Sequence, residues 1–252
     1  QIVSLMENDA IIGMRVHNWI NCQRLMWTAL RDEFHANADA YLAEMESADN
    51  AGPGSLELNT GLVIPEYTTH EIHIQPGGYV GDDFAGHIYH YGTNNFFEGR
   101  NDQDELHISL AGAVPEPEDG KVARILDQGC SSGQLSVALK ERFPDADVWA
   151  IDVGGPMVRY THMRAVDIGV DVNFAQRLAE DSKFPDNHFD VTCSVTVIEE
   201  LDANVMIAEM MRVTKPGGQV GVICRALDLR WVMNAPVEPE LRAKPEVEGI
   251  GG

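Results

Sequence analysis

Apolar residues recur every three or four positions through the first part of the chain. Over residues 9–47 this spacing predicts one long amphipathic helix or two, ending before the turn-forming segment 49–54. The apolar positions are Ile11, Ile12, Val16, Trp19, Ile20, Leu25, Met26, Leu30, Phe34, Tyr41, Leu42 and Met45. These positions cover a sector of the helix surface wide enough to indicate packing on more than one side. The second surface has two candidate partners, another part of the same chain and a second copy in a homodimer.

A different pattern occupies residues 122–139. Ile125 and Leu126 supply the apolar core of a buried strand, whereas Leu135 and Leu139 recur at helical spacing. Small residues separate the two runs. The segment therefore predicts a strand, a tight turn and a helix.

The turn between this strand and helix suits a polar ligand. Gly129 and Gly133 allow positive φ and a close approach of the backbone. The helix N-terminus directs backbone N–H groups toward the same place. Asp127 ends the strand, and its carboxylate disfavours a phosphate and favours a cation or an ammonium-bearing ligand.

The spacing of small residues separates two families that use such a turn. A dinucleotide-binding G-x-G-x-x-G motif starting at Gly129 requires small residues at positions 131 and 134, and Gln134 is too large for close helix–strand packing. Residues 127–133, Asp-Gln-Gly-Cys-Ser-Ser-Gly, instead resemble the D-x-G-x-G-x-G motif of class I S-adenosylmethionine (SAM)-dependent methyltransferases. Ser131 stands at the middle glycine of that motif.

Later segments resemble the same family in the expected order. A strand over residues 148–151 ends at Asp152, about twenty residues beyond the turn. The remaining segments are 174–190, similar to A-E-D-L-P-F-P-D-x-S-F-D, 191–198, similar to the fourth strand, and 206–223, similar to the E-x-x-R-V-L-K-P-G-G helix, turn and fifth strand. The chain departs from the family at Leu178, where relatives usually carry an acid, and at Lys183, which replaces a proline.

The resemblance implies an α/β fold, a Rossmann-like doubly wound sheet of the class I methyltransferase type. It implies a helical and lid extension over residues 1–113 and a SAM-binding domain over residues 121–252, of the small-molecule type found in ubiquinone and menaquinone biosynthesis. Seven strands are expected in this fold, and five are assigned here. Because the sequence from Leu227 onward is typical of a loop, we expect the C-terminal strands to be missing and the fifth strand to lie at a sheet edge.

The resemblance also assigns residues to the cofactor. Asp152 is expected to accept hydrogen bonds from both ribose hydroxyls, the apolar residue after it to pack on the adenine, and Ala179 and Glu180 to border the adenine amino group. The full set of expected cofactor-binding residues is Tyr91, Asp127, Gly129, Cys130, Ser131, Gly133, Asp152, Val153, Met157, Ala179, Glu180, Asp181 and Ser194.

Histidine and tyrosine are concentrated in residues 67–92, which the resemblance places over the cofactor as a lid. Tyr89, His90 and Tyr91 are expected near the methionine end of SAM. The H-x-x-H spacings at 70/73 and 87/90 lack the further ligands that a metal site needs, so we predict no metal. Neutral histidines bonded to their neighbours and a single histidine base remain the two interpretations.

The candidate catalytic bases are His87, His90 and Glu200. Glu200 and Glu199 follow the fourth strand, where the family's substrate side opens. For this glutamate pair, a solvated start of the next helix is the alternative interpretation.

Composition narrows the choice of partner. The chain has 252 residues and a net charge of -22, which disfavours a nucleic-acid partner. The [ND]-P-P-[YF] tetrapeptide of amino-directed nucleic-acid methyltransferases is absent after the fourth strand, which favours a small-molecule acceptor. No apolar run approaches the ~18–20 residues that span a bilayer, and no signal peptide is visible, so we expect no membrane partner. The four cysteines form no C-x-x-C pair, which favours a reducing, cytoplasmic location.

Three functions follow from these observations. The favoured one is transfer of a methyl group from SAM to an oxygen, nitrogen or sulfur atom of a small metabolite. A SAM-binding protein without transfer activity, acting through partner contact, is the alternative that the departures at Ser131 and Leu178 keep open. Another SAM-consuming reaction on the same fold is the third, because a fold does not determine its chemistry.

Overall fold

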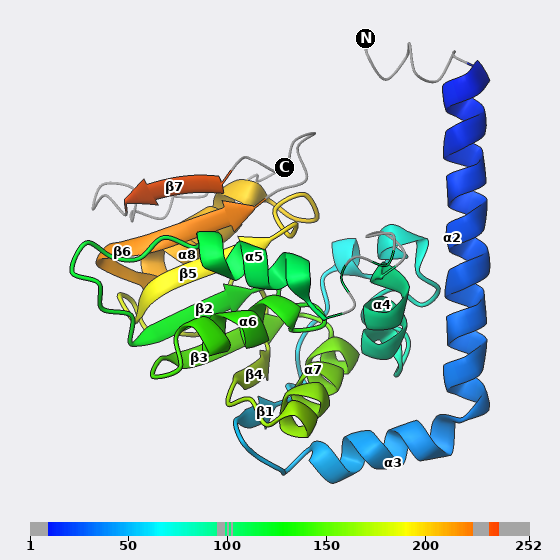
Figure 1. Cartoon of the computed structure of the whole chain (residues 1–252), viewed down its shortest axis with the longest axis horizontal. Helices are drawn as coiled ribbons and strands as arrows, with labels where there is room; N and C mark the ends of the chain where they lie inside the picture. The colour runs from blue at the N-terminus through cyan, green and yellow to red at the C-terminus, as the bar shows by residue number, and fades with distance from the viewer. Residues whose placement is uncertain (1–9, 95–98, 100, 102, 224–231, 237–252) are drawn as a thin grey trace, which may run out of the picture.

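The computed structural model describes residues 10–94, 99, 101, 103–223 and 232–236 (Figure 1). Its helices are α2 (Ala10–Ala36), α3 (Ala38–Ala48), α4 (Ala85–Thr93), α5 (Glu105–Ala113), α6 (Gln134–Arg142), α7 (Gly155–Ile168) and α8 (Ala203–Val213), with 3-10 turns η1 (Glu66–Thr68) and η2 (Ile72–Ile74). Its strands are β1 (Ser55–Glu57), β2 (Arg124–Gln128), β3 (Asp147–Asp152), β4 (Asn173–Gln176), β5 (Phe189–Val195), β6 (Thr214–Ile223) and β7 (Val232–Pro236).

The strands form one sheet, which over the described residues has seven strands in the order β1-β4-β3-β2-β5-β6-β7. Neighbouring strands from β1 to β6 are parallel, and β7 runs antiparallel to β6. The strand order changes direction at β2, which pairs with β3 on one side and β5 on the other. In an open parallel sheet, ligands bind outside the carboxyl ends of the strands at such a point. The predicted doubly wound α/β fold is confirmed.

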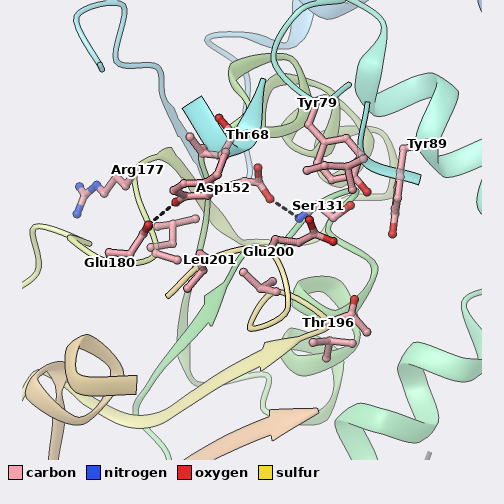
Figure 2. A pocket seen from close by; sticks show the side chains of 18 of the residues that line it. Thr68, Tyr79, Tyr89, Ser131, Asp152, Arg177, Glu180, Thr196, Glu200 and Leu201 are labelled. Atoms are coloured by element: carbon pink, nitrogen blue, oxygen red, sulfur yellow. Dashed lines mark hydrogen bonds between the residues drawn. The ribbon is translucent and has the colours of Figure 1, made fainter. Parts of the chain in front are cut away.

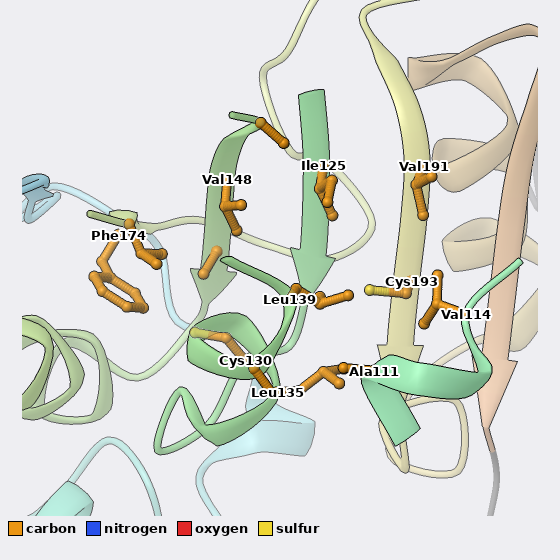
Figure 3. Packing of buried hydrophobic residues seen from close by; sticks show 14 of the residues in the cluster. Ala111, Val114, Ile125, Cys130, Leu135, Leu139, Val148, Phe174, Val191 and Cys193 are labelled. Atoms are coloured by element: carbon orange, nitrogen blue, oxygen red, sulfur yellow. The ribbon is translucent and has the colours of Figure 1, made fainter. Parts of the chain in front are cut away.

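Apolar side chains cover both faces of the sheet, as a parallel sheet between helices requires. Ile125 packs with α6 and its neighbours on one face, whereas the next residue, Leu126, belongs to a separate cluster with Phe184 and Phe189. Both are fully buried. Figure 3 shows the first cluster, in which Leu135 and Leu139 of α6 lie against β2 and β3. The helical spacing of these leucines therefore marks the face of α6 that packs on the sheet.

β1 is a strand that the sequence pattern did not predict. It pairs with β4 along the sheet edge, where Ser55 Oγ donates a hydrogen bond to Asn173 Oδ1 at 2.7 Å. Three residues are too few to show a period of two. The N-terminal part of the chain thus contributes directly to the sheet that positions the site.

The predicted loop from Leu227 onward is wrong at Val232–Pro236, where β7 pairs with residues 219–223 of β6. Consequently β6 does not lie at the sheet edge. Proline is tolerated at position 236 because it is the last residue of β7, and β7 is an edge strand of the sheet over the described residues. The rest of the expected C-terminal hairpin falls on residues 224–231 and 237–252, which lie outside the described residues.

The apolar positions at helical spacing near the N-terminus belong to two helices, α2 and α3, which meet at Asn37. Trp27 and Phe34 of α2 pack with Phe84 and Ile88, so that α4 lies between α2 and α7 (Figure 1). α2 also exposes apolar side chains, including Ile11 at 67% and Leu25 at 73%. Over the residues that were searched, none of the helices combines the length and apolar character needed to cross a bilayer.

Candidate functional site

The turn after β2 brings backbone and side-chain groups to the sheet's switch point. Gly129, Ser131 and Gly133 all have positive φ, of 81°, 50° and 70°. A Cβ at Gly129 would overlap the Val197 side chain, and one at Gly133 would overlap Thr161. The glycines are thus required by contacts within the protein as well as by the turn itself.

Asp152, at the end of β3, holds this turn in place. Its Oδ2 accepts a hydrogen bond from the Ser131 N–H at 2.9 Å (Figure 2). Its Oδ1 accepts one from the Gly154 N–H at 2.9 Å. The residue is 7% exposed, and burial raises its pKa although the backbone N–H groups oppose the rise. The carboxylate is therefore fixed in orientation before any ligand binds.

Asp127, at the end of β2, is more deeply buried. Ser136 of α6 donates a hydrogen bond to its Oδ2 at 2.6 Å. Burial raises the pKa of Asp127 to about 7, and the negative charge of Asp152 adds to this rise. A positively charged ligand would offset the cost of ionising this group.

A cavity of about 660 Å³, including its open mouth, lies outside the carboxyl ends of the strands. Its lining comes from the turn after β2, the end of β3 and the segments that follow β4 and β5, together with the tyrosine-rich segment 67–92. The lining residues include Gly129, Ser131, Asp152, Val153, Ala179, Glu180, Thr196, Val197, Glu200, Tyr67, Thr68, Tyr79 and Tyr89. A second cavity, of about 370 Å³, adjoins it and is lined by Asp127, Cys130, Ser132, Gln134 and His107 among others.

The two cavities adjoin at the turn and share part of their walls, and together they are called the crevice. Both are lined by Gly129, Ser131, Tyr89, Val195 and Thr196. An elongated ligand could therefore extend over the turn, with one half facing Asp152 and the other facing Asp127.

Two buried polar atoms in the wall lack a hydrogen-bond partner within the described structure, Ser131 Oγ and Glu180 Oε2. Buried polar atoms are nearly always paired, because leaving one unpaired costs about 1–3 kcal/mol. The other carboxylate oxygen of Glu180 accepts a hydrogen bond from the Tyr67 hydroxyl. The unpaired atoms fit a ligand that, like SAM, carries hydroxyl and amino groups.

Nine of the predicted cofactor-binding and catalytic residues line the crevice. They are Gly129, Ser131, Asp152, Val153, Ala179, Glu180 and Glu200 in the first cavity and Asp127 and Cys130 in the second.

Five other predicted cofactor residues line neither cavity, and Tyr91, one of the five, is described below. Gly133 is the N-cap of α6, and Met157 is fully buried within α7. Ser194 Oγ donates a hydrogen bond to the Gln128 carbonyl at 2.6 Å. Asp181 is exposed and pairs with Lys183.

The predicted lid histidines lie outside the crevice. His87 is 2% exposed and surrounded by aromatic rings, including Phe34 and Tyr160. His90 bonds to the Tyr160 hydroxyl. Burial lowers the pKa of both histidines to about 4. Of the three catalytic candidates, Glu200 is the one whose side chain reaches the cavity.

The tyrosines are placed differently from the expectation. Tyr91 is 62% exposed and packs against the Phe34 ring, whereas Tyr89 lines both cavities. Tyr67 and Tyr79 also line the first cavity and were not singled out from the sequence. The density of tyrosine in this segment was the available signal, but it does not tell which rings point inward.

Among the described residues, no group of three or more histidine, cysteine, aspartate or glutamate side chains is arranged to hold a metal ion. His87 and His90 both lie against the Tyr160 ring, whereas His70 Nε2 lies 3.6 Å from Glu200 Oε2 and His73 lines the first cavity.

Comparisons with known proteins bear on the same region. A family model described as a methyltransferase domain matches residues 125–218. The chain is 37% identical over 102 residues to the ubiquinone/menaquinone biosynthesis C-methyltransferase UbiE of Cupriavidus pinatubonensis, covering 40% of this chain and 42% of that protein. It is 36% identical over 101 residues to the demethylmenaquinone methyltransferase of Thermus thermophilus, covering 40% and 46%. The crystal structure of the PH0226 protein of Pyrococcus horikoshii is 20% identical, covers 56% of this chain and 62% of that one, and has a TM-score of 0.45.

The chain spans less than half the length of these two curated relatives. The matched region contains the turn after β2, Asp152 and Glu180, which line the crevice. Residues 125–218 of the chain are therefore similar to methyltransferase domains, and this similarity covers the part of the chain that forms the crevice.

Proposed function

We propose that this chain is an enzyme that transfers a methyl group from SAM to a small-molecule acceptor. The observation that carries the proposal is the crevice at the switch point, where Asp152 is oriented by two backbone N–H groups and Ser131 Oγ and Glu180 Oε2 have no partner within the described structure. These groups fit the hydroxyl and amino groups of a nucleoside.

Each half of the crevice has a role in this proposal. Asp152 binds the ribose hydroxyls, and Val153, Ala179 and Glu180 border the adenine. Asp127, in the second cavity, lies toward the methionine half, where its charge offsets that of the ammonium group.

The residues facing the acceptor chiefly position it and exclude water. When bound, SAM supplies a methyl group that its sulfonium already activates, so alignment accounts for much of the rate enhancement. A base is required where the acceptor atom must lose a proton. Glu200 is the candidate, because its carboxylate lines the first cavity.

The acceptor atom is the finer part of the proposal. The sequence analysis favours an oxygen, nitrogen or sulfur atom without identifying which, whereas the name of the Cupriavidus relative indicates carbon for that protein. A small-molecule acceptor is supported by the net charge of -22, which opposes binding of nucleic acid.

Two further inferences concern the whole protein. We infer a cytoplasmic location, supported by cysteines that remain free at Cys22, Cys130 and Cys193. A homodimer through α2 is supported by its exposed Ile11, Met14 and Leu25, and light scattering of the purified chain would test it.

Calorimetric titration with SAM tests the proposed cofactor site. Asp152→Ala is expected to weaken SAM binding by well over about tenfold, because the ribose loses its carboxylate partner. Asp167→Asn, an exposed position at the end of α7, is the matched control and should bind SAM as the wild type does. Unchanged binding by Asp152→Ala would refute the placement of the ribose. Tight SAM binding without product in a broad acceptor screen would favour the alternative without transfer activity.

A further inference from the structure

Three aromatic residues, His73, Tyr79 and Tyr89, form an aromatic wall of the first cavity. The Tyr79 and Tyr89 ring centroids are 5.2 Å apart at 80°, and the His73 ring lies 6.5 Å and 6.2 Å from them. All three residues line this cavity. Figure 2 shows Tyr79 and Tyr89 on the same side of the cavity as Ser131.

Glu200 places a carboxylate beside this wall. It comes from the segment after β5, and its side chain is 31% exposed. The His70 Nε2 atom lies 3.6 Å from its Oε2 on the outer side, and His70 does not line the cavity. One oxygen of Glu200 thus remains for a ligand.

The charges around the cavity favour a cation. Asp152, Glu180 and Glu200 contribute carboxylates to the lining. The guanidinium of Arg177 is already bonded, since it donates to Glu57 Oε2 at 2.7 Å and lies 4.3 Å from the Phe184 ring centroid. An anionic acceptor would therefore meet several negative charges, and among the described lining residues no uncommitted guanidinium offsets them.

The tyrosine rings favour the same kind of ligand. Burial raises the pKa of Tyr79 well above its usual value, so its phenol stays neutral and its ring presents an uncharged π face. A cation over such a face is attracted by the ring quadrupole, and cages of aromatic rings with a carboxylate recognise ammonium groups in this way.

We infer that the methyl acceptor is an amine, bound as its ammonium form between Tyr79, Tyr89 and Glu200. This inference rests on the proposed methyltransferase function and adds the chemical class of its acceptor.

The transfer step balances for such an acceptor. An ammonium has no free electron pair, so it first gives one proton to the Glu200 carboxylate. The nitrogen then forms its bond to the methyl carbon while the sulfur–methyl bond breaks, and that bond's electron pair stays on sulfur. The product is a methylated ammonium and a neutral thioether, and Glu200 later releases its proton to water.

Binding of three matched probes tests the inference without relying on turnover. The full chain, saturated with S-adenosylhomocysteine, would be titrated by calorimetry with 2-phenylethylamine, 2-phenylethanol and 3-phenylpropanoate. These share an aromatic body and differ in charge. We expect the ammonium to bind at least about tenfold more tightly than the alcohol, and the carboxylate more weakly than either.

Two glutamine variants assign the preference to one side chain. Glu200→Gln should remove the preference for the ammonium over the alcohol. Glu199→Gln, at the exposed neighbouring position that lines neither cavity, should keep it. Equal binding of amine and alcohol, a preference that survives in Glu200→Gln, or binding by none of the probes would each overturn the inference.

The proposed function fails in a different way. If S-adenosylhomocysteine and SAM do not bind the wild-type chain, the methyltransferase proposal itself is wrong. If they bind and Asp152→Ala weakens them, the cofactor site stands, and the probe titrations then decide the acceptor class alone.

Discussion

Two carboxylates at the ends of adjacent strands dominate the site at the scale of single residues. Asp127 and Asp152 are 1% and 7% exposed, and burial raises the pKa of each. A buried carboxylate is costly to ionise unless hydrogen bonds or a positive charge stabilise it. Ser136 and the backbone N–H groups of residues 131 and 154 supply part of that stabilisation. A cationic ligand would supply the rest, which links its affinity to pH.

SAM affinity should therefore rise with pH. Because the pKa of Asp127 is about 7, its ionised fraction grows steeply through neutrality. If SAM binds the ionised form, its affinity should increase about tenfold from about pH 6 to about pH 8. The stability of the unliganded chain changes with pH in the opposite direction. Because the pKa of Asp127 is raised in the folded state, this group stabilises the fold at low pH, and its contribution is lost as the pH rises through about 7.

Calorimetry at the two pH values measures this prediction. Asp127→Asn should flatten the rise, since the variant has no group at this position to ionise. The idea does not survive if the variant retains the full wild-type pH dependence.

At the scale of elements, helix α4 joins the N-terminal helices to the sheet through close glycine contacts. A Cβ at Gly86 would overlap Tyr160 of α7, and a Cβ at Gly92 would overlap the Trp27 ring of α2. Trp27 is fully buried, and its Nε1 donates a hydrogen bond to the His73 carbonyl at 3.0 Å. Through these contacts α4 determines where Tyr89, a residue of both cavity walls, is placed.

Gly92→Ala is expected to lower the free energy of unfolding by about 1–3 kcal/mol, because the added methyl group must displace a buried ring. Gly112→Ala in α5 is the matched control, since nothing lies within 4 Å of its added Cβ. That change should be neutral or stabilising by up to about 1 kcal/mol through helix propensity. Urea denaturation of both variants measures the difference, and equal stabilities would show that α2 and α4 are not packed this closely.

At the scale of the whole molecule, the excess of negative charge opposes the compact state. The chain carries 40 acidic and 18 basic residues. Several cations form ion pairs, such as Arg159 with Asp49 at 2.7 Å, which joins α7 to the end of α3. The surplus carboxylates repel one another, and dissolved salt screens this repulsion.

Salt should consequently stabilise the chain. Raising NaCl from about 0.02 M to about 0.5 M shortens the Debye length several-fold and should raise the melting temperature by a few degrees. The effect should shrink near pH 5, where protonation of carboxylates reduces the net charge. Thermal scans under the four conditions test this, and a salt response independent of pH would point away from charge repulsion.

The part of the site that was predicted from the sequence is the part formed by local chain segments. Asp127, Gly129, Cys130 and Ser131 belong to one strand and turn, and Asp152 ends the next strand. Parallel pairing of β2 with β3 then places these short segments side by side. Strand ends and turn residues can be read from neighbouring positions, so these lining residues of the crevice could be predicted from the sequence.

Which tyrosines line the first cavity could not be predicted from the sequence and depended on the tertiary structure. Tyr67, Tyr79 and Tyr89 reach the cavity while Tyr91 and His87 do not, and no local spacing distinguishes them. The orientation of His87, Tyr89 and Tyr91, which all belong to α4, follows from the packing of α4 against α2 and α7, which joins segments far apart in the chain. The sequence by itself thus determined the fold class and the strand-end and turn residues that line the crevice, because strand, turn and helix signals are local. Only the tertiary structure decided which aromatic side chains reach the first cavity, because that depends on long-range packing.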